Sequence, residues 1–528
     1  MTGVLAEVAL ESSRLEKTSS TRSPLQWVGP AVVSASTLLA LLVNGYHPWV
    51  EDGGVYGAGI KHLLNPQLYP QQTGFVTEHL RFSLYAPFVA GLTRTTHLPL
   101  TWVLLLLYIA SIWLTLFATW MLAGRCFTSL EARVGAVVLL ACWLDLPLAG
   151  TSLMWMDPYL TARSLSTPPT LLALCWALEA LDHAGRRPAR WAWLRCSLAL
   201  LAALSMHPLM AGYGLLAVAA LIAMSACTPR RRIWAGTGFC CAGLLCGLAV
   251  QRLSIIESPN YLRVVLTRQY WFPATWQWYE DLGLIAPLVI LAAMLFWQNR
   301  ASDLPAYRRL ARMGLTLGLV AMVIAWCYAR VSLATHAVAR LQPLRAFQLV
   351  YCVMIVLLGG AIAEYLLRRK LLRWLALLAL ASVPMWLAQR ATFPSSKHLE
   401  MPWTAPDNQW VQTFDWIKHN TPETALFAMD PHYTTMDGED AQGFRAIAER
   451  SALPDYAKDG GETSITPQLT AAWIAGQQAQ SQVNAESDAD RLAYLSPLGV
   501  DWLVLPIASA TQLPCPYRNR LVQVCRLR

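Results

Sequence analysis

The sequence has few charged residues, and it contains neither an internal repeat nor a low-complexity segment. Asp, Glu, Lys and Arg make up only 14% of the 528 residues, whereas soluble globular chains carry about 25%. Disorder requires low hydrophobicity and high charge, but 55% of this chain is hydrophobic. The composition therefore excludes an ordinary soluble enzyme and a disordered chain, and it indicates an integral membrane protein.

Metal-binding cysteine patterns are also missing. The chain has 12 cysteines, but no Cys-x-x-Cys pair and no Cys/His spacing that predicts a zinc site. Ten of the cysteines lie in apolar segments, where cysteine behaves as a small buried hydrophobic residue. Only Cys515 and Cys525 lie in a polar segment, and we expect a disulfide between them if that segment is exported.

Eleven apolar stretches reach or approach the roughly 20 residues that a helix needs to cross a bilayer. The first is a full-length span rather than a cleavable signal. The fifth and sixth are short and meet at Met206-His207-Pro208, so one broken helix is the alternative there. The predicted spans are 27–46, 99–123, 133–150, 166–183, 191–206, 208–226, 233–251, 283–298, 313–331, 344–366 and 374–390.

Basic residues fall in every second loop, as the positive-inside rule expects of cytoplasmic loops. The chain carries a formal net charge of +9, and no nucleic-acid-binding motif accompanies it, so we expect no nucleic-acid partner. This pattern predicts a cytoplasmic N-terminus and an outer C-terminal tail. The basic loop residues are Arg125, Arg133, Arg186, Arg187, Arg190, Arg230, Arg231, Arg232, Arg300, Arg308, Arg309, Arg312, Arg368, Arg369, Lys370 and Arg373. The predicted outer loops are 47–98, 151–165, 252–282 and 332–343.

The tail has the alternating helix-like and strand-like segments of a small α/β domain. A helix is predicted at Trp410 to Lys418, and strands at Ala425 to Met429, at Gly499 to Pro506 and, as an edge strand, at Leu521 to Arg528. The predicted fold is mainly α, a polytopic membrane helix bundle with a C-terminal extracytoplasmic α/β domain. Its parts are a cytoplasmic segment 1–26, a transmembrane domain 27–390 and a soluble domain 391–528.

Two adjacent carboxylates, Glu51 and Asp52, follow directly after the first span. Charges at the membrane surface are expensive unless they are solvated, paired or used in function. Gly53-Gly54 allows the backbone to approach a ligand closely, and residues 55–64 predict a short helix in the membrane interface. The alternative is that the acid pair solvates the loop or caps this helix.

This stretch resembles the GT-C superfamily, whose members are polytopic glycosyltransferases that use polyprenyl-phosphate-linked sugars. The resemblance rests on the acid pair after the first span, Tyr56, the interfacial helix, Leu68-Tyr69-Pro70, the span number and the outer tail. The local motif covers about 25 residues, and the architecture covers most of the chain. It implies that Asp52 or Glu51 is the catalytic acidic residue, and the Glu-Asp order, reversed from some members, leaves open which one acts.

The implied reaction needs two kinds of group. An acceptor loses a proton while it attacks the sugar, so a carboxylate serves as the general base. The leaving group is a lipid phosphate, whose charge requires Arg or Lys. Arg345 lies at the outer end of a span, against the positive-inside trend, and is the main candidate for the phosphate, with Gln342 beside it. The alternative for Arg345 is snorkelling to lipid headgroups.

Further candidate substrate-binding residues lie in the other outer loops. Asp157 resembles a second acidic position of several GT-C enzymes and could bind the acceptor, or a divalent metal ion together with Asp52. The alternative is an ion pair with Arg163 or a simple turn. His207 could bind a sugar or phosphate, and the alternative is a turn histidine bonded to backbone. Arg263, Arg268 and Tyr270 suit a phosphate headgroup or a stacked sugar, or else ordinary interfacial anchors.

We therefore expect a membrane glycosyltransferase that moves a sugar from a polyprenyl-phosphate donor to an unknown glycan, lipid or protein acceptor on the outer face. Membrane lipid is a further partner, no cofactor is certain, and a divalent metal ion stays open. The compact loops favour a bacterial inner membrane with a periplasmic tail. The alternatives are a lipid-linked saccharide transporter, for which we find no paired broken helices, and a non-catalytic envelope assembly protein.

Overall fold

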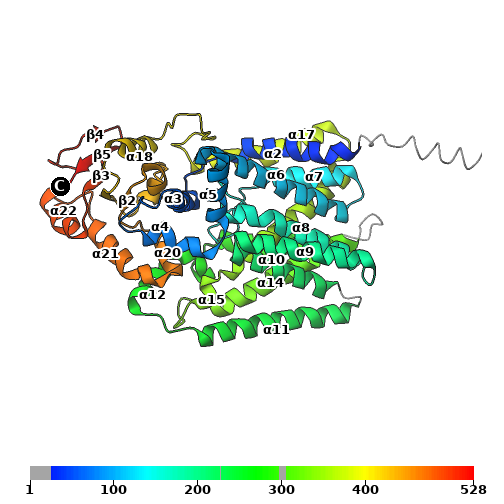
Figure 1. Ribbon diagram of the computed structural model, residues 1–528. Helices are drawn as coiled ribbons and strands as arrows, with labels where there is room; N and C mark the ends of the chain where they lie inside the picture. Colours follow the sequence, from blue (N-terminus) through cyan, green and yellow to red (C-terminus); the bar gives the residue numbers. More distant parts are fainter. Residues whose placement is uncertain (1–24, 226–227, 297–304) are drawn as a thin grey trace, which may run out of the picture.

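The computed structural model describes residues 25–225, 228–296 and 305–528 (Figure 1). The predicted fold class is confirmed: the chain is mainly helical, with a bundle of long helices and a small α/β unit at one end. The predicted segment 1–26, except for its last two residues, and the predicted loop residue Arg300 lie outside the described residues. The outer-loop helices and the C-terminal unit lie at the same end of the bundle in Figure 1.

Seven helices of the described part are long and apolar enough to cross a membrane. The side chains of these helices are apolar on all sides, so each helix can face lipid on one side and pack against other helices on the other. They are α2 (Leu25–Asn44), α6 (Leu100–Cys126), α11 (Pro229–Leu253), α13 (Trp278–Phe296), α14 (Pro305–Tyr328), the helical run Ala337–Leu367, which contains α16 (Phe347–Ala361) and the π-helical turn η5 (Ile362–Leu367), and α17 (Leu371–Thr392).

Four further helices correspond to the remaining predicted spans, but one of these predictions is wrong in length. The four helices are α7 (Leu130–Cys142), α8 (Ala162–Asp182), α9 (Arg187–Met206) and α10 (Pro208–Met224). The span predicted at 133–150 ends as a helix at Cys142. Beyond it Pro147 forms a β-bridge with Met154, and the backbone N–H of Asp145 donates to Asn44 Oδ1 over 3.4 Å. A charged residue and a proline close together end the helix, because proline cannot continue it.

The loops predicted on the outer side contain short helices that bring the candidate site residues to one end of the bundle. The first loop forms α3 (Asp52–Leu64), α4 (Gly74–Thr77), η1 (Glu78–Phe82) and α5 (Tyr85–Thr96). The later loops form α12 (Pro259–Leu266), η2 (Gln269–Trp271), η3 (Pro273–Thr275), α15 (Ala337–Arg340) and η4 (Pro343–Ala346). The interfacial helix predicted at 55–64 thus begins at Asp52, inside the acid pair.

The C-terminal unit is a five-stranded sheet with helices on both faces. Its strand order is β2-β1-β3-β5-β4, with β2, β1 and β3 parallel and β5 antiparallel to both of its neighbours. The strands are β1 (Leu426–Ala428), β2 (Ser451–Ala452), β3 (Trp502–Pro506), β4 (Tyr517–Arg518) and β5 (Val522–Arg526). The helices are α18 (Gln409–Asn420), α19 (Phe444–Ala448), α20 (Lys458–Ile465), α21 (Thr470–Gln480) and α22 (Asp488–Leu495), with η6 (Tyr433–Thr435), η7 (Pro467–Leu469) and η8 (Ser496–Leu498) between them.

Alternation along the strands explains why both faces of this sheet are covered. Phe427, Val504 and Val524 belong to one buried cluster with α18, whereas Leu503 and Leu505 belong to a second cluster with α22. Neighbouring residues of a strand point to opposite faces, so strands with apolar residues at every position are buried on both sides. The prediction that the last segment is an edge strand is wrong, because β5 lies between β3 and β4.

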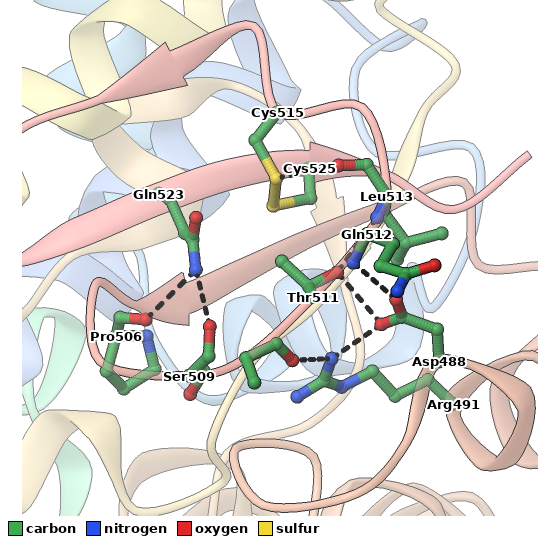
Figure 2. The surroundings of a disulfide bond; sticks show 11 residues. Asp488, Arg491, Pro506, Ser509, Thr511, Gln512, Leu513, Cys515, Gln523 and Cys525 are labelled. Atoms are coloured by element: carbon green, nitrogen blue, oxygen red, sulfur yellow. Dashed lines mark hydrogen bonds and ion pairs between the residues drawn. A yellow bond between two sulfur atoms is a disulfide. The ribbon is translucent and has the colours of Figure 1, made fainter.

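A disulfide closes the end of the C-terminal unit (Figure 2). The sulfur atoms of Cys515 and Cys525 are bonded, across a sequence separation of 10 residues. The same loop is held by Asp488, whose carboxylate accepts hydrogen bonds from Thr511 Oγ1 at 2.8 Å and from the backbone of Gln512 at 2.7 Å (Figure 2). The loop before β5 is therefore fixed at two points.

Glycines allow α3 to pack closely on the C-terminal unit. A Cβ atom on Gly54 would lie 2.8 Å from Cα of Gly443, and one on Gly57 would lie 3.3 Å from Cβ of Ala446. On the same helix, Lys61 Nζ donates to the backbone carbonyl of Ala446 and to Glu449, each over 2.6 Å. The close approach that we predicted for Gly53-Gly54 is thus an approach to protein backbone, and it joins the C-terminal unit to the first outer loop.

Candidate functional site

The acid pair lies at the start of α3, in a backbone conformation that glycine would adopt more easily. Glu51 has φ 51° and ψ −128°, and Asp52 is the first residue of the helix. Such conformations cost about 1–3 kcal/mol and persist only where the surroundings hold them. The backbone N–H of Glu51 donates to Gln442 Oε1 of the C-terminal unit, and the side chain of Gln442 lies 3.5 Å from Glu51 Oε1.

One lysine of the C-terminal unit binds both carboxylates. Lys458 is the first residue of α20, and its Nζ pairs with Glu51 Oε2 and lies 3.1 Å from Asp52 Oδ1. Burial alone would raise the pKa of Asp52, but the positive charges of Lys458, Arg163 and Arg345 lower it to about 2. Asp52 is therefore ionised throughout the physiological range.

Asp157 lies near Asp52 but has a partner of its own. Its carboxylate forms a buried ion pair with Arg163, and it accepts a weak hydrogen bond from Thr161 Oγ1 at 3.4 Å. Thr161 and Ser164 form the capping box of α8, which fixes the turn that carries both members of the ion pair. Burial raises the pKa of Asp157, Arg163 opposes this, and the charge of Asp52 adds to the rise. Of the alternatives for Asp157, the structure thus contains the ion pair with Arg163.

Arg345 differs from these residues because no described side chain forms a hydrogen bond or an ion pair with its guanidinium. It lies in η4, and within the described residues its guanidinium makes neither a hydrogen bond nor an ion pair; its Nε is buried without a partner. Arg163, Asp52, Tyr270 and Tyr213 surround it closely enough to act on its charge. A partly buried guanidinium that makes no direct ion pair with the described residues suits an anion-binding position.

Two other predicted residues lie at the edge of this group. His207 lies close enough to Arg163, Arg345 and Asp52 to interact with their charges. It is also the N-cap of α10, because its Nδ1 accepts a hydrogen bond from the backbone N–H of Met210 over 3.3 Å. Gln342 adopts φ 50° immediately before η4, and its Oε1 is buried without a hydrogen bond in the described part of the chain. Its backbone carbonyl accepts a hydrogen bond from Tyr213 Oη over 3.0 Å.

Arg268 and Arg263 do not join Arg345, which corrects their predicted role at the phosphate. Arg268 is buried and donates to the backbone carbonyls of Ala457 at 2.6 Å and Tyr456 at 3.0 Å. Arg263 is exposed on α12. Arg268 therefore anchors the residues that lead into α20, whereas Tyr270 of the same loop interacts electrostatically with Arg345.

The sequence prediction missed Lys458 and Gln442, and it used Tyr56 for the resemblance but not as a site residue. Lys458 is separated from Asp52 by 406 positions, and nothing in its local sequence signals the contact. The rings of Tyr56 and His79 lie edge to face with centroids 5.6 Å apart, and both ring nitrogens of His79 are buried without a partner among the described residues. Burial lowers the pKa of His79 to about 4, so the ring is neutral.

The acidic residues of this group do not fit a divalent metal ion as they are arranged. Lys458 takes both carboxylates of the acid pair, and Arg163 takes Asp157. Within residues 25–225, 228–296 and 305–528, no group of three or more His, Cys, Asp or Glu side chains has the arrangement of a metal site. We derive no step through a metal ion.

No protein-family model and no curated protein matches the chain. Solved structures of similar fold are those of the oligosaccharyltransferase of the archaeon Archaeoglobus fulgidus. Its complex of AglB with an inhibitory peptide and a dolichol-phosphate has a TM-score of 0.45 and 12% identity, and the match covers 91% of this chain and 70% of that chain. The apo form has a TM-score of 0.48 and 13% identity over the same shares of 91% and 70%. At 12% and 13% identity, the likeness concerns the fold alone.

Proposed function

We propose that this integral membrane protein transfers a sugar from a polyprenyl-phosphate donor to an acceptor on the outer face of the membrane. The observation that supports the proposal is the guanidinium of Arg345, which has no hydrogen bond or ion pair in the described chain and interacts electrostatically with the ionised Asp52. An anion site next to a permanently charged carboxylate suits a reaction in which a phosphate leaves and a nucleophile is oriented.

The chemistry of Arg345 favours a phosphate over other anions. Its planar fork of N–H donors binds phosphate oxygens in pairs, and such charge-assisted bonds are about twice as strong as neutral ones. The phenol groups of Tyr213 and Tyr270 lie near the same guanidinium. Arg345 lies in η4, between the short helix α15 and the long apolar helix α16, so a lipid tail bound to the phosphate can stay in the bilayer while the sugar faces Asp52.

The proposed step breaks the bond between the anomeric carbon and the donor phosphate oxygen and forms one between that carbon and the acceptor atom. The phosphate keeps the electron pair of the broken bond, and the acceptor's proton passes to a phosphate oxygen as the new bond forms. Arg345 stabilises the leaving phosphate. Because the pKa of Asp52 is about 2, this carboxylate orients the acceptor by accepting its hydrogen bond, and it is a weak proton acceptor.

We place this reaction in the periplasm of a bacterium, with the C-terminal unit outside the cytoplasm. The disulfide between Cys515 and Cys525 supports an exported unit, because such bonds persist in oxidising compartments. The basic residues of the opposite loops support a cytoplasmic N-terminus.

The first test is native mass spectrometry of the full chain in nanodiscs titrated with undecaprenyl phosphate. We expect saturable binding that Arg345→Ala weakens by at least roughly tenfold, the size of a lost charge-assisted pair. Arg330→Ala is the matched control, because Arg330 is an exposed arginine that follows the outer end of α14. Equal binding by both variants would contradict the role of Arg345.

A second test separates a transferase from a transporter of the same lipid. With a radiolabelled polyprenyl-phosphate sugar and a membrane extract as acceptor, the wild-type chain should release undecaprenyl phosphate, and Asp52→Asn should bind the donor without turnover. Lipid movement across the bilayer by Asp52→Asn at the wild-type rate would favour the transporter. Full turnover by this variant would remove Asp52 from the reaction.

A further inference from the structure

The acid pair already contains a cation that belongs to the chain. Two consecutive carboxylates, from Glu51 and Asp52, converge on Nζ of Lys458, which is 24% exposed, whereas most lysines are fully solvated. Convergence of carboxylate oxygens on one point is also the arrangement by which proteins hold Mg²⁺, Ca²⁺ or Mn²⁺. The ammonium group occupies that point.

The position of Lys458 is fixed from both sides of the chain. The carbonyls of the two preceding residues accept hydrogen bonds from Arg268, and the backbone N–H of Lys458 itself donates to Asp455 at 2.6 Å. The following residue, Asp459, is held by a two-bond contact with Arg445 at 2.7 and 2.8 Å. An exposed lysine without a function would not need its backbone held in this way, whereas a lysine whose ammonium group must stay at one position would.

The other acidic group of the site does not supply a second cation position. Asp157 forms a buried ion pair with Arg163, so its carboxylate already has a cation of the chain beside it. A divalent ion at the acid pair would have to displace the ammonium of Lys458, which is tied to both carboxylates.

We propose that Lys458 is the resident cation of this site, and that it replaces a divalent metal ion in positioning the acid pair. The lysine comes from the C-terminal unit, so that unit is a working part of the site. Lys458 acts as a positioning residue: it holds the carboxylate of Asp52 in the orientation that an acceptor requires. The part of the inference that concerns turnover rests on the proposed transferase function, and the part that concerns the cation does not.

The proposal that Lys458 occupies the cation position of the acid pair is tested without any substrate. Full-length protein in nanodiscs, treated with chelator and then dialysed, is titrated with Mn²⁺ while electron paramagnetic resonance follows the free ion. We expect the wild-type chain and Asp52→Asn to bind the same number of ions, because Lys458 closes the site. Lys458→Ala should bind one more ion per chain than the wild type, and the double variant with Asp52→Asn should lose it. The control is Lys397→Ala, whose lysine pairs with Asp407 at 3.2 Å elsewhere in the unit.

Two outcomes of this titration overturn the proposal. One is an ion that the wild type binds and Asp52→Asn does not, because the acid pair would then be open to metal. The other is a Lys458→Ala chain that keeps the wild-type melting temperature and gains no ion. Should Lys458→Ala unfold, Lys458→Gln, which keeps the length and removes the charge, gives the same comparison.

Turnover gives the second readout. We expect chelator to leave the wild-type rate unchanged and Lys458→Ala to lower it by roughly a hundredfold, with partial recovery in methylammonium or Mn²⁺, which a purely structural role would not produce. A wild-type rate that falls with chelator and returns with Mn²⁺ contradicts metal replacement. If no turnover is found under any condition, the transferase proposal fails, while the ion titration still decides the role of Lys458.

Discussion

At the scale of single residues, Glu462 gives the site a dependence on pH that its carboxylates alone do not suggest. It is buried in α20, where burial and the negative charges of Asp459, Glu78 and Asp52 raise its pKa to about 7 against a weaker opposing bond from Thr466. A carboxyl whose pKa is higher in the folded than in the unfolded chain is most stabilising below its unfolded value. Stability is then lost as pH rises from about 4.5 to 7, by roughly 3 kcal/mol.

We therefore predict that Glu462→Gln removes this loss. Its melting temperature should equal that of the wild type at pH 5 and exceed it by several degrees at pH 8, where the wild-type carboxylate is charged and buried. Melting curves of the purified chain, followed by intrinsic fluorescence from pH 5 to pH 8, measure the difference. Parallel curves for the two proteins at every pH would show that Glu462 keeps an ordinary pKa.

At the same scale, the sequence could predict Asp52, Asp157 and Arg345 as neighbours, because each follows or precedes a membrane span at the same face. Position relative to a span is readable from hydropathy. It could not predict Lys458, since this lysine lies 406 positions from Asp52 in the C-terminal unit, and only packing brings it to the acid pair. It also could not separate Arg268 from Arg345, because both are arginines in outer segments.

At the scale of elements, the disulfide and Asp488 hold the loop before β5 at two points, so each contributes only part of the stability of this loop. Chain-entropy reasoning gives about 3 kcal/mol for a disulfide that closes a loop of this size. Cys515→Ser with Cys525→Ser should lower the melting temperature of the C-terminal unit, but the unit should still fold, because Asp488 continues to bind Thr511 and Gln512. Reduction of the wild-type chain should reproduce the shift. Loss of undecaprenyl phosphate binding in the double variant would contradict a purely local role.

Hydropathy predicted the positions of the long helices because a bilayer leaves no alternative for an apolar segment of that length. It failed at 133–150, where α7 ends at Cys142 and the following apolar residues form a turn against Asn44. Apolar composition shows that a segment is buried but does not show whether it is helical. The edge-strand prediction for 521–528 failed similarly, because strand order depends on β4, a two-residue strand without a sequence signal.

At the scale of the whole molecule, Arg268 links the membrane bundle to the position of Lys458. Its side chain extends from the 252–282 loop, and its guanidinium donates hydrogen bonds to the carbonyls of Tyr456 and Ala457. The guanidinium also lies 5.7 Å from the centre of the Tyr456 ring. Hydrogen bonds from a charged donor contribute about 1.5–3 kcal/mol each. Arg268→Ala should therefore loosen the start of α20 without changing Arg345.

We predict that Arg268→Ala keeps the wild-type affinity for undecaprenyl phosphate but lowers turnover at least roughly tenfold, because two such bonds are lost and the acid pair loses its fixed lysine. Limited proteolysis should also cut this variant faster near residues 455–465. Arg263→Ala is the matched control, since Arg263 lies on α12 only five positions away and is exposed. If both variants behave alike, the contact between loop and unit does not position Lys458. If Arg268→Ala weakens donor binding as much as Arg345→Ala does, Arg268 belongs to the phosphate site as the sequence first indicated.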